Sequence, residues 1–317
     1  MACERKLLES EATIGFFVLL GTKGKKETLE WCMKANLIAS RYECPRCKKE
    51  MSLQERKGTV DGYEWRCRSQ SKDNPHDFVR SVRKGTWFSE SKLGITIILC
   101  LTRYWFGKSM NAFMVNDLKV NKNTVVDWYM FCREVCMIAC VKESAKLGGV
   151  GEIVEIDESL FGKMKYGKGR RGNVKWVFGG VQRESKKCFF RVVQSRTKEE
   201  LLKIIHEWIL PGTTIISDCW KSYDCLSGEG YVHLRVNHSL TFVDPETGAH
   251  TISIEGTWSA IKKGLHKAHV KGQFDSYLAE FMWRRSNGHK LVDDNFHEFL
   301  ASIARMYPPT EHDEMQA

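Results

Sequence analysis

Three acidic residues have the types and settings that a divalent-metal site needs. Asp157 closes the alternating run EIVEID, which predicts a strand whose last residue turns out of the sheet. Asp218 closes a second apolar run, TTIISD, and Glu255 lies early in ISIEGTWSAIKKGL, where apolar residues recur at helical spacing. Carboxylates are hard oxygen ligands, and Mg²⁺ or Mn²⁺ between them activates water and steadies a phosphoryl group. The three residues therefore predict metal-dependent phosphoryl transfer, with solvated surface charge as the alternative for any of the 39 acidic residues.

A second candidate metal site lies nearer the N-terminus and uses softer ligands. Cys44 and Cys47 form a CPRC knuckle, Cys67 follows the strand-like segment YEWRC, and His76 lies beyond it in a polar loop. Three thiolates and one imidazole suit tetrahedral Zn²⁺, and four protein ligands leave no open position, so we expect a structural ion in a zinc ribbon. A lone CxxC is also common as a redox or incidental pair, and the gap between Cys67 and His76 is longer than that of a usual knuckle.

Helices are predicted on both sides of this ribbon. KETLEWCMKANLIAS, residues 26–40, has an amphipathic helical pattern, and residues 92–106 form a strongly apolar segment of helix length. Residues 108–118 and 123–137 then predict two helices joined by the polar turn VNKN. This order is typical of a helix-turn-helix, whose second helix enters the major groove of DNA; a plain helical hairpin is the alternative. Cys132, Cys136 and Cys140 share one face of the second helix, as core residues or, alternatively, metal ligands.

The charge of the chain is unevenly distributed. Residues 1–150 carry 26 Lys and Arg against 17 Asp and Glu, whereas the remainder carries 23 against 22. We therefore expect the first half to supply much of the attraction for a nucleic-acid backbone. The apolar runs IGFFVLL and ITIILCL are too short to span a bilayer, and acidic residues precede the first of them. We expect an intracellular protein with no membrane partner, nuclear in a eukaryote, whose twelve cysteines are reduced thiols wherever they do not bind metal.

Strands and helices alternate from residue 150 onward in an order that suits the acidic residues. The predicted strands are residues 150–157, 174–182 and 188–194, followed by helix 198–209 and the strand that ends at Asp218. Three strands before the first long helix match the opening of a ribonuclease H-like mixed sheet, which places Asp157 and Asp218 on adjacent strands. We expect the final helices, residues 274–286 and 295–307, to cover this sheet.

Several phrases of this region resemble the catalytic domain of a known family: VEIDES, FGGVQRES, TTIISDCWKSY, VNHSLTFVDPETGAHTISIEGTWSAIKK and FMWRRS. They are similar to the Merlin family of cut-and-paste DNA transposons and to bacterial insertion-sequence relatives that carry an N-terminal zinc ribbon. The resemblance runs from residue 151 to about residue 299. It implies a ribonuclease H-like fold with an Asp-Asp-Glu (DDE) triad formed by Asp157, Asp218 and Glu255, which holds two Mg²⁺ or Mn²⁺ ions.

This resemblance implies an enzyme, a DNA transposase that binds terminal inverted repeats, cleaves the ends and joins the 3′-hydroxyl to target DNA. It also implies a homodimer or larger assembly, because two ends must meet. A host-recruited DNA-binding protein without transposition and a ribonuclease H-like nuclease that cuts without joining are the alternatives. The auxiliary candidates are His238, His250 and Lys262. The candidate DNA-binding residues are Lys48, Lys49, Arg66, Arg68, Lys119, Lys122, Asn123, Thr124, Lys163, Lys165, Lys168, Arg170 and Arg171.

The expected organisation is a multidomain α+β and α/β chain. Residues 1–40 form an N-terminal helical segment, 41–90 the zinc ribbon, 91–147 the helix-turn-helix region, 150–307 the catalytic domain and 308–317 a tail.

Overall fold

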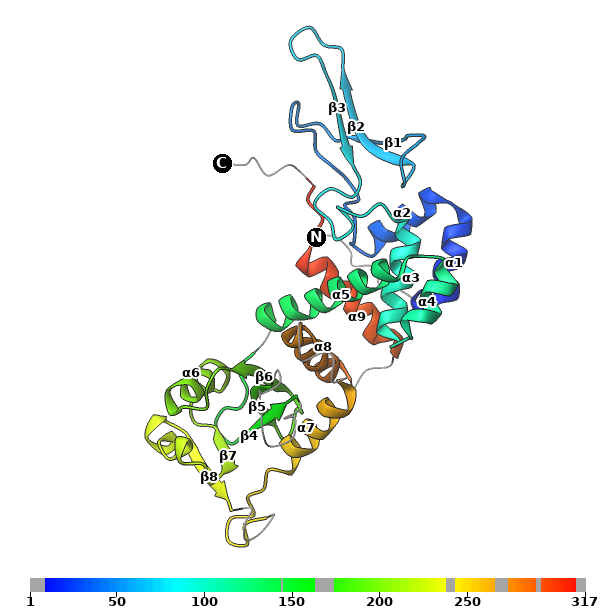
Figure 1. The fold of residues 1–317 in the computed structure, drawn as a ribbon. Helices are drawn as coiled ribbons and strands as arrows, with labels where there is room; N and C mark the ends of the chain where they lie inside the picture. The colour runs from blue at the N-terminus through cyan, green and yellow to red at the C-terminus, as the bar shows by residue number, and fades with distance from the viewer. Residues whose placement is uncertain are drawn as a thin grey trace. The chain divides into compact units, whose positions relative to one another are not determined.

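The computed structural model describes residues 9–143, 145–162, 174–237, 243–265, 273–288 and 292–311 (Figure 1). The chain divides into two units, the first formed by Met1–Val135 with Lys290–Ala317 and the second by Cys136–His289. Among the described helices, none combines the length and the apolar character that a membrane crossing requires.

Helices and one small sheet build the first unit, and its last helix comes from the C-terminal end of the chain. Phe17 contacts Phe296 with ring centroids 6.0 Å apart, and Trp105 contacts Phe299 at 4.8 Å. The C-terminal helix therefore completes this core, and the expectation that it covers the catalytic sheet is wrong. In chain order the elements are η1 (Glu9–Ala12), α1 (Ile14–Lys23), α2 (Lys25–Lys34), β1 (Ser52–Glu55), β2 (Tyr63–Ser69), β3 (His76–Ser81), α3 (Ile95–Phe106), α4 (Asn111–Leu118), the start of α5 (Lys122–Lys142) and α9 (Val292–Met306).

Helix α2 ends earlier than its apolar pattern predicts. Asn36 adopts the left-handed backbone conformation with φ 56°, and the N–H of Leu37 bonds back to the carbonyl of Cys32 at 2.9 Å. This is a Schellman closure, in which asparagine replaces the more common glycine at the left-handed position. The predicted extension of the helix to Ser40 is therefore wrong, because Asn36 is a stop signal.

Strands β1, β2 and β3 form an antiparallel meander in that order. Cys67 lies within β2, and His76 is the first residue of β3, paired with Ser69. The antiparallel register thus brings the two later predicted zinc ligands to the same end of the meander, although a loop separates them in the sequence.

Helices α4 and α5 are joined by a short turn, as the sequence predicts. Lys119 ends α4 in the left-handed conformation with φ 54°, and the side chain of Asn121 accepts the N–H of Asn123 at 2.8 Å. That bond satisfies a backbone donor at the start of α5. Helix α5 then continues without a break to Lys142, beyond the predicted end at residue 137.

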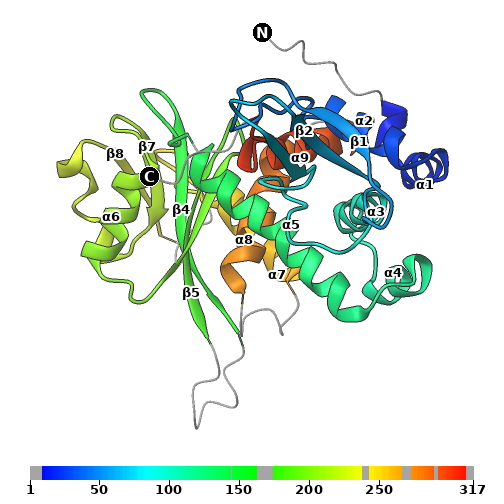
Figure 2. The same ribbon diagram turned by 90° about the horizontal axis from the view of Figure 1, so that it is seen from above.

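A five-stranded mixed sheet forms the centre of the second unit, in the order β6-β5-β4-β7-β8 (Figure 2). The β6–β5 and β5–β4 pairs are antiparallel, whereas β4–β7 and β7–β8 are parallel. This is the mixed order expected of a ribonuclease H-like sheet, and Asp157 and Asp218 indeed lie on adjacent strands. The elements are β4 (Ile153–Phe161), β5 (Lys175–Gln182), β6 (Cys188–Val193), α6 (Lys198–Trp208), β7 (Thr214–Asp218), η2 (Lys221–Tyr223), η3 (Leu226–Glu229), β8 (Val232–Val236), α7 (Ile252–Gly264) and α8 (Phe274–Asn287).

Aromatic side chains attach helices to both faces of this sheet. On one face, Trp208 at the end of α6 stacks on Phe189 with centroids 5.4 Å apart. On the other face, Trp258 of α7 contacts Phe190 at 4.9 Å, and α8 adds a contact between Phe281 and Phe190 at 6.0 Å. Adjacent residues of β6 therefore face opposite layers, as the two-residue period of a strand requires.

Candidate active site and zinc centre

Asp157 lies in the middle of strand β4, which continues to Phe161. The expectation that Asp157 ends its strand is wrong, because the antiparallel pairing with β5 extends through Phe161 opposite Lys175. The side chain is half-buried and points to the face that α7 covers, where Trp258 Nε1 donates a hydrogen bond to Asp157 Oδ2 at 2.9 Å. The first predicted ligand is thus held by the pairing of β4 with β5 and by one indole N–H.

Asp218 ends strand β7, as predicted. β4 and β7 run parallel with Glu155 opposite Ile216, so Asp157 and Asp218, each two residues further along, lie at the same level of neighbouring strands. They share a face of the sheet because side chains alternate with period two. Asp218 Oδ1 accepts the backbone N–H of Trp220 at 3.0 Å.

A glycine makes room for the indole beside Asp157. Gly179 pairs directly with Asp157 across β4 and β5. A Cβ at this position would lie 2.9 Å from the ring of Trp258 and would also overlap Phe190. The missing side chain therefore lets Trp258 lie close enough to the sheet for its N–H to reach the Asp157 carboxylate.

The electrostatics of Asp157 suit a cation-binding carboxylate. The pKa of Asp157 is raised to about 7, first by burial and also by the negative charges of Glu158 and Asp218, against the hydrogen bonds that lower it. Neither Asp157 nor Asp218 forms an ion pair with any residue that the structure describes. A divalent cation would relieve this repulsion and restore the charged form of Asp157.

Glu255 lies in the first turn of α7, on a helix that is fastened to the same strand. Buried Glu155 of β4 accepts the N–H of Ile254 at 3.0 Å and an Arg183 N–H at 2.6 Å. The Glu255 side chain is exposed and accepts the hydroxyl of Thr251 at 2.9 Å. α7 thus places Glu255 near the strand that carries Asp157, but the three carboxylates do not all lie within 4.8 Å of one another.

The auxiliary candidates have different positions. His250 lies with Nδ1 3.6 Å from buried Glu155, and its backbone carbonyl accepts from Arg183 at 2.7 Å. Lys262 is exposed on α7, with its ammonium 5.4 Å from the ring centroid of Phe161. His238 lies outside the described residues.

Cys44, Cys47, Cys67 and His76 form a cluster in the first unit, with one ligand atom of each within 4.8 Å of the others. The sulfurs of Cys47 and Cys67 are 3.5 Å apart, and His76 Nε2 lies 3.6 Å and 3.5 Å from the sulfurs of Cys44 and Cys67. A tetrahedral zinc with Zn–S bonds of about 2.3 Å would give edges of about 3.7 Å, close to these distances.

The imidazole of this cluster is oriented by its second nitrogen. His76 Nδ1 lies 3.0 Å from the backbone carbonyl of Asn74, the partner that fixes the ring of a metal-bound histidine through an N–H donor. A hydrogen bond from the Lys49 backbone lowers the pKa of Cys47, whereas burial and the neighbouring thiols raise that of Cys67 to about 12. The donor set fits Zn²⁺, since the metal favours the thiolate form of all three cysteines.

The candidate DNA-binding residues divide into three groups. Lys48, Lys49 and Arg68 are exposed beside the zinc cluster, while Arg66 is engaged by Asp77 through an Nε–Oδ1 bond of 2.8 Å. Lys119, Lys122 and Asn123 are exposed at the turn between α4 and α5, and Thr124 is half-buried. Five more lie outside the described residues: Lys163, Lys165, Lys168, Arg170 and Arg171.

Sequence reasoning overlooked a hydrogen-bonded pair next to the aspartates, half-buried Glu158 and buried Tyr223. The hydroxyl of Tyr223 donates to Glu158 Oε1 at 2.6 Å, and burial raises the pKa of Glu158. Glu158 follows Asp157 directly but points to the opposite face of β4. The second glutamate of VEIDES and the tyrosine of DCWKSY were available as signals, but only the pairing of distant strands brings them together.

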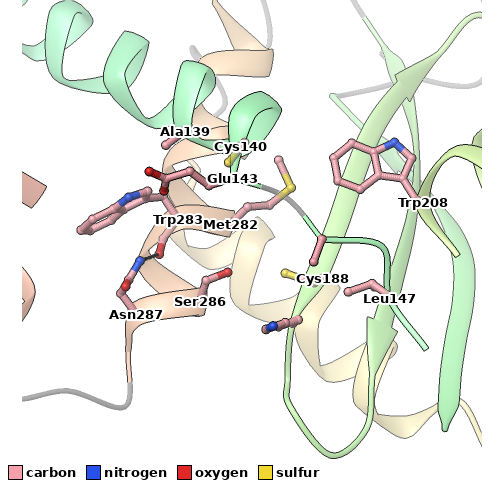
Figure 3. A pocket seen from close by; sticks show the side chains of 12 residues that line it. Ala139, Cys140, Glu143, Leu147, Cys188, Trp208, Met282, Trp283, Ser286 and Asn287 are labelled. Atoms are coloured by element: carbon pink, nitrogen blue, oxygen red, sulfur yellow. Dashed lines mark hydrogen bonds between the residues drawn. The ribbon is translucent and has the colours of Figure 1, made fainter. Parts of the chain in front are cut away.

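A cavity of about 230 Å³ in the second unit does not include Asp157, Asp218 or Glu255 among its lining residues (Figure 3). Cys140 and Cys188 line it with Trp208, Met282 and Trp283. Burial raises the pKa of both thiols to about 12, so they are protonated packing groups. Cys132 and Cys136 are fully buried, in line with the core alternative for the three cysteines of α5.

Comparison with known proteins places the second unit among transposases. Residues 146–286 match the model of the ISXO2-like transposase domain. An uncharacterized transposase-like protein of Haemophilus influenzae is 33% identical over 103 residues, which cover 32% of this chain and 82% of the relative.

Solved structures of retroviral integrases are also similar. The dimeric catalytic core domain of HTLV-2 integrase, in complex with magnesium, matches with 16% identity and a TM-score of 0.29 over 44% of this chain and 88% of the other. The simian T-cell lymphotropic virus intasome, in complex with the PP2A regulatory subunit B56 gamma, matches with 14% identity and a TM-score of 0.30 over 58% and 67%. At these low TM-scores the strand order of the sheet itself remains the basis for the fold assignment.

Proposed function

Because the chain belongs to the DDE superfamily of transposases, with an ISXO2-like transposase domain, we propose that it cleaves transposon ends and joins them to target DNA. The proposed substrates are double-stranded terminal inverted repeats and a target duplex. Since two ends must be brought together, the proposed active form is a homodimer or a larger assembly. The narrower resemblance to Merlin elements remains a prediction.

The observation that supports this function best is the placement of Asp157 and Asp218 on neighbouring parallel strands. The two carboxylates lie at the same level of adjacent parallel strands and lack ion-pair partners among the described residues. Two close carboxylates without a basic partner are what a divalent metal requires, whereas a purely structural pair would be neutralised by Lys or Arg.

We assign the metal ligands as Asp157, Asp218 and Glu255. Two Mg²⁺ or Mn²⁺ ions held by these residues would activate the attacking oxygen and stabilise the leaving oxygen of a phosphodiester. Asp157 is the proposed shared ligand, because it lies half-buried within a continuous strand and is oriented by the indole N–H of Trp258. Glu255 is exposed at the start of α7, where it is accessible to a substrate phosphate and its metal.

The remaining residues position this site. The buried Glu155–Arg183 pair holds the first turn of α7 against β4, which keeps Glu255 near the aspartates. Lys262, about two turns beyond Glu255 on α7, is proposed to contact phosphates near the scissile bond, and His250 to organise the loop before the helix.

The first unit is proposed to bind the terminal repeats. Helix α5 would enter the major groove as the second helix of a helix-turn-helix. Lys119 in the preceding turn and Lys122 and Asn123 at the start of α5 would contact DNA. The zinc ribbon would hold Lys48, Lys49 and Arg68 against the phosphate backbone. The basic residues between positions 163 and 171 are proposed to hold DNA beside the catalytic carboxylates.

A cleavage and strand-transfer assay on labelled DNA carrying the element's ends tests the proposal. Asp157→Ala, Asp218→Ala and Glu255→Ala should each abolish both reactions in Mg²⁺ or Mn²⁺, while Glu207→Ala, an exposed acid on α6, should retain both. If the wild type cuts without joining, the protein is a nuclease. If it binds the ends without cutting, it is a DNA-binding protein only. If Glu255→Ala alone stays active, Asp244 or Glu246 supplies the third ligand.

A further inference from the structure

An exposed tryptophan lies beside the second aspartate. Of the ten tryptophans, all of which the structure describes, Trp220 alone is exposed, with 40% of its surface accessible. It follows Asp218 by two residues, and its backbone N–H donates to the Asp218 carboxylate at 3.0 Å. The indole is therefore fixed relative to a proposed metal ligand.

A guanidinium group supports the indole ring. The Arg196 guanidinium carbon lies 3.8 Å from the ring centroid of Trp176 and 4.6 Å from that of Trp220. The Trp220 ring N–H is already used, since it donates to the hydroxyl of Ser222 at 2.7 Å. With its edge bonded and one face on Arg196, the indole offers an exposed apolar face and no free donor.

The loop that carries Trp220 is anchored at its far end as well. Tyr223 is buried, and its hydroxyl donates to Glu158 of the central strand at 2.6 Å. Ser222 additionally donates to the Arg196 carbonyl at 3.4 Å. A large aromatic ring that is held rigidly at the surface loses little conformational entropy on binding. This rigidity favours a binding role for Trp220 over an exposed position without function.

We infer that the exposed face of Trp220 stacks on an unpaired DNA base next to the phosphodiester that is cut. This inference rests on the proposed function, because it adds a base-binding position to the same site. Aromatic rings bind bases of any sequence through their flat faces, and a guanidinium group strengthens such stacks. Lys221 is exposed next to Trp220 and forms no ion pair with a described residue, so it is free to bind the adjacent phosphate.

Binding to a short labelled oligothymidylate, single-stranded or annealed to oligoadenylate, tests this inference by fluorescence anisotropy. The full chain would carry Asp157→Asn, so that no strand is cut during the measurement. Trp220→Ala should reduce the affinity for the single strand about 5- to 100-fold, with a smaller effect on the duplex. Trp220→Phe should restore most of that affinity because it keeps a ring, and Val232→Ala, which trims another exposed apolar side chain of this unit, should change neither affinity.

Equal single-strand affinities for Trp220→Ala and its parent would overturn the inference, as would a loss that Trp220→Phe does not restore. A change of oligomer mass with both DNA affinities intact would also overturn it, since the ring would then contact protein. The proposed function fails separately, through a wild type that does not cleave its ends in Mg²⁺. Where cleavage is observed, Trp220→Ala should slow it on paired ends more than on ends with mismatches at the cut site.

Discussion

The zinc cluster and the carboxylate site differ in how the chain assembles them. The four zinc ligands fall between Cys44 and His76. A tight turn carries Cys44 and Cys47, the pairing of β2 with β3 brings Cys67 to His76, and the four ligand atoms lie within 4.8 Å of one another. The carboxylates come from two parallel strands and a helix, and they do not reach that spacing. Neutral thiols and an imidazole can pack together, whereas carboxylates repel one another. We infer from this difference that the zinc centre stabilises the fold of the first unit. In the carboxylate site, the mutual repulsion of the negative charges favours the binding of cations.

The largest expected effect concerns the zinc centre. Cys67→Ser should abolish zinc binding and remove on the order of 10 kcal/mol of metal-linked folding energy, so that the ribbon unfolds. Zinc content by mass spectrometry and thermal unfolding by circular dichroism measure both consequences. Cys219→Ser, at an exposed cysteine outside the cluster, is the matched control and should change neither. If Cys67→Ser keeps one zinc per chain and an unchanged melting temperature, the zinc centre does not stabilise the ribbon through Cys67.

An intermediate effect is expected from the pH dependence of Asp157. Its folded-state pKa of about 7 lies above the ordinary value of 3.8, so its contribution to stability is fully present below pH 4 and is lost as the pH rises through 7. Three pKa units correspond to at most about 4 kcal/mol. In metal-free buffer at pH 8, Asp157→Asn should therefore melt at a higher temperature than the wild type, and the difference should vanish near pH 4.

Magnesium should make the wild type melt at a higher temperature than Asp157→Asn at pH 8. The ion stabilises the wild type by binding the folded carboxylates, and its effect should grow between pH 6 and pH 8 as Asp157 loses its proton. The Asn variant should respond much less to the ion. If the melting temperatures of the two proteins change with pH in parallel, or if magnesium raises both by the same amount, Asp157 is not a cation ligand with a raised pKa.

The smallest effect tests the packing that orients Asp157. Gly179→Ala would insert a Cβ against Trp258 and Phe190, and overpacking of this kind costs about 1–3 kcal/mol. Urea unfolding should show this loss, together with weaker magnesium stabilisation because the Trp258 N–H moves away from Asp157. Gly228→Ala has open space around its Cβ and serves as the control. If Gly179→Ala matches that control in both measurements, Trp258 does not position the aspartate.

Much of the fold could be predicted, because its signals are local. A short apolar run identified β7 and its terminal Asp218, and helical spacing identified α7 around Glu255. Knuckle spacing together with one downstream histidine identified all four members of the Cys-His cluster. Local patterns were less accurate at the ends of elements, where Asn36 stops α2 and antiparallel pairing prolongs β4 past Asp157.

The sequence by itself determined the candidate metal ligands and the order of most strands and helices, though not α1 or β8, since ligand chemistry and periodicity act over a few residues. Only the tertiary structure decided that Asp157 lies within a continuous strand opposite Gly179, that Trp258 donates to it, and that α9 completes the first unit rather than covering the sheet. These features depend on strand register and on side chains that are distant in sequence. The free energy by which these contacts stabilise the fold is gained only when the distant partners pack together.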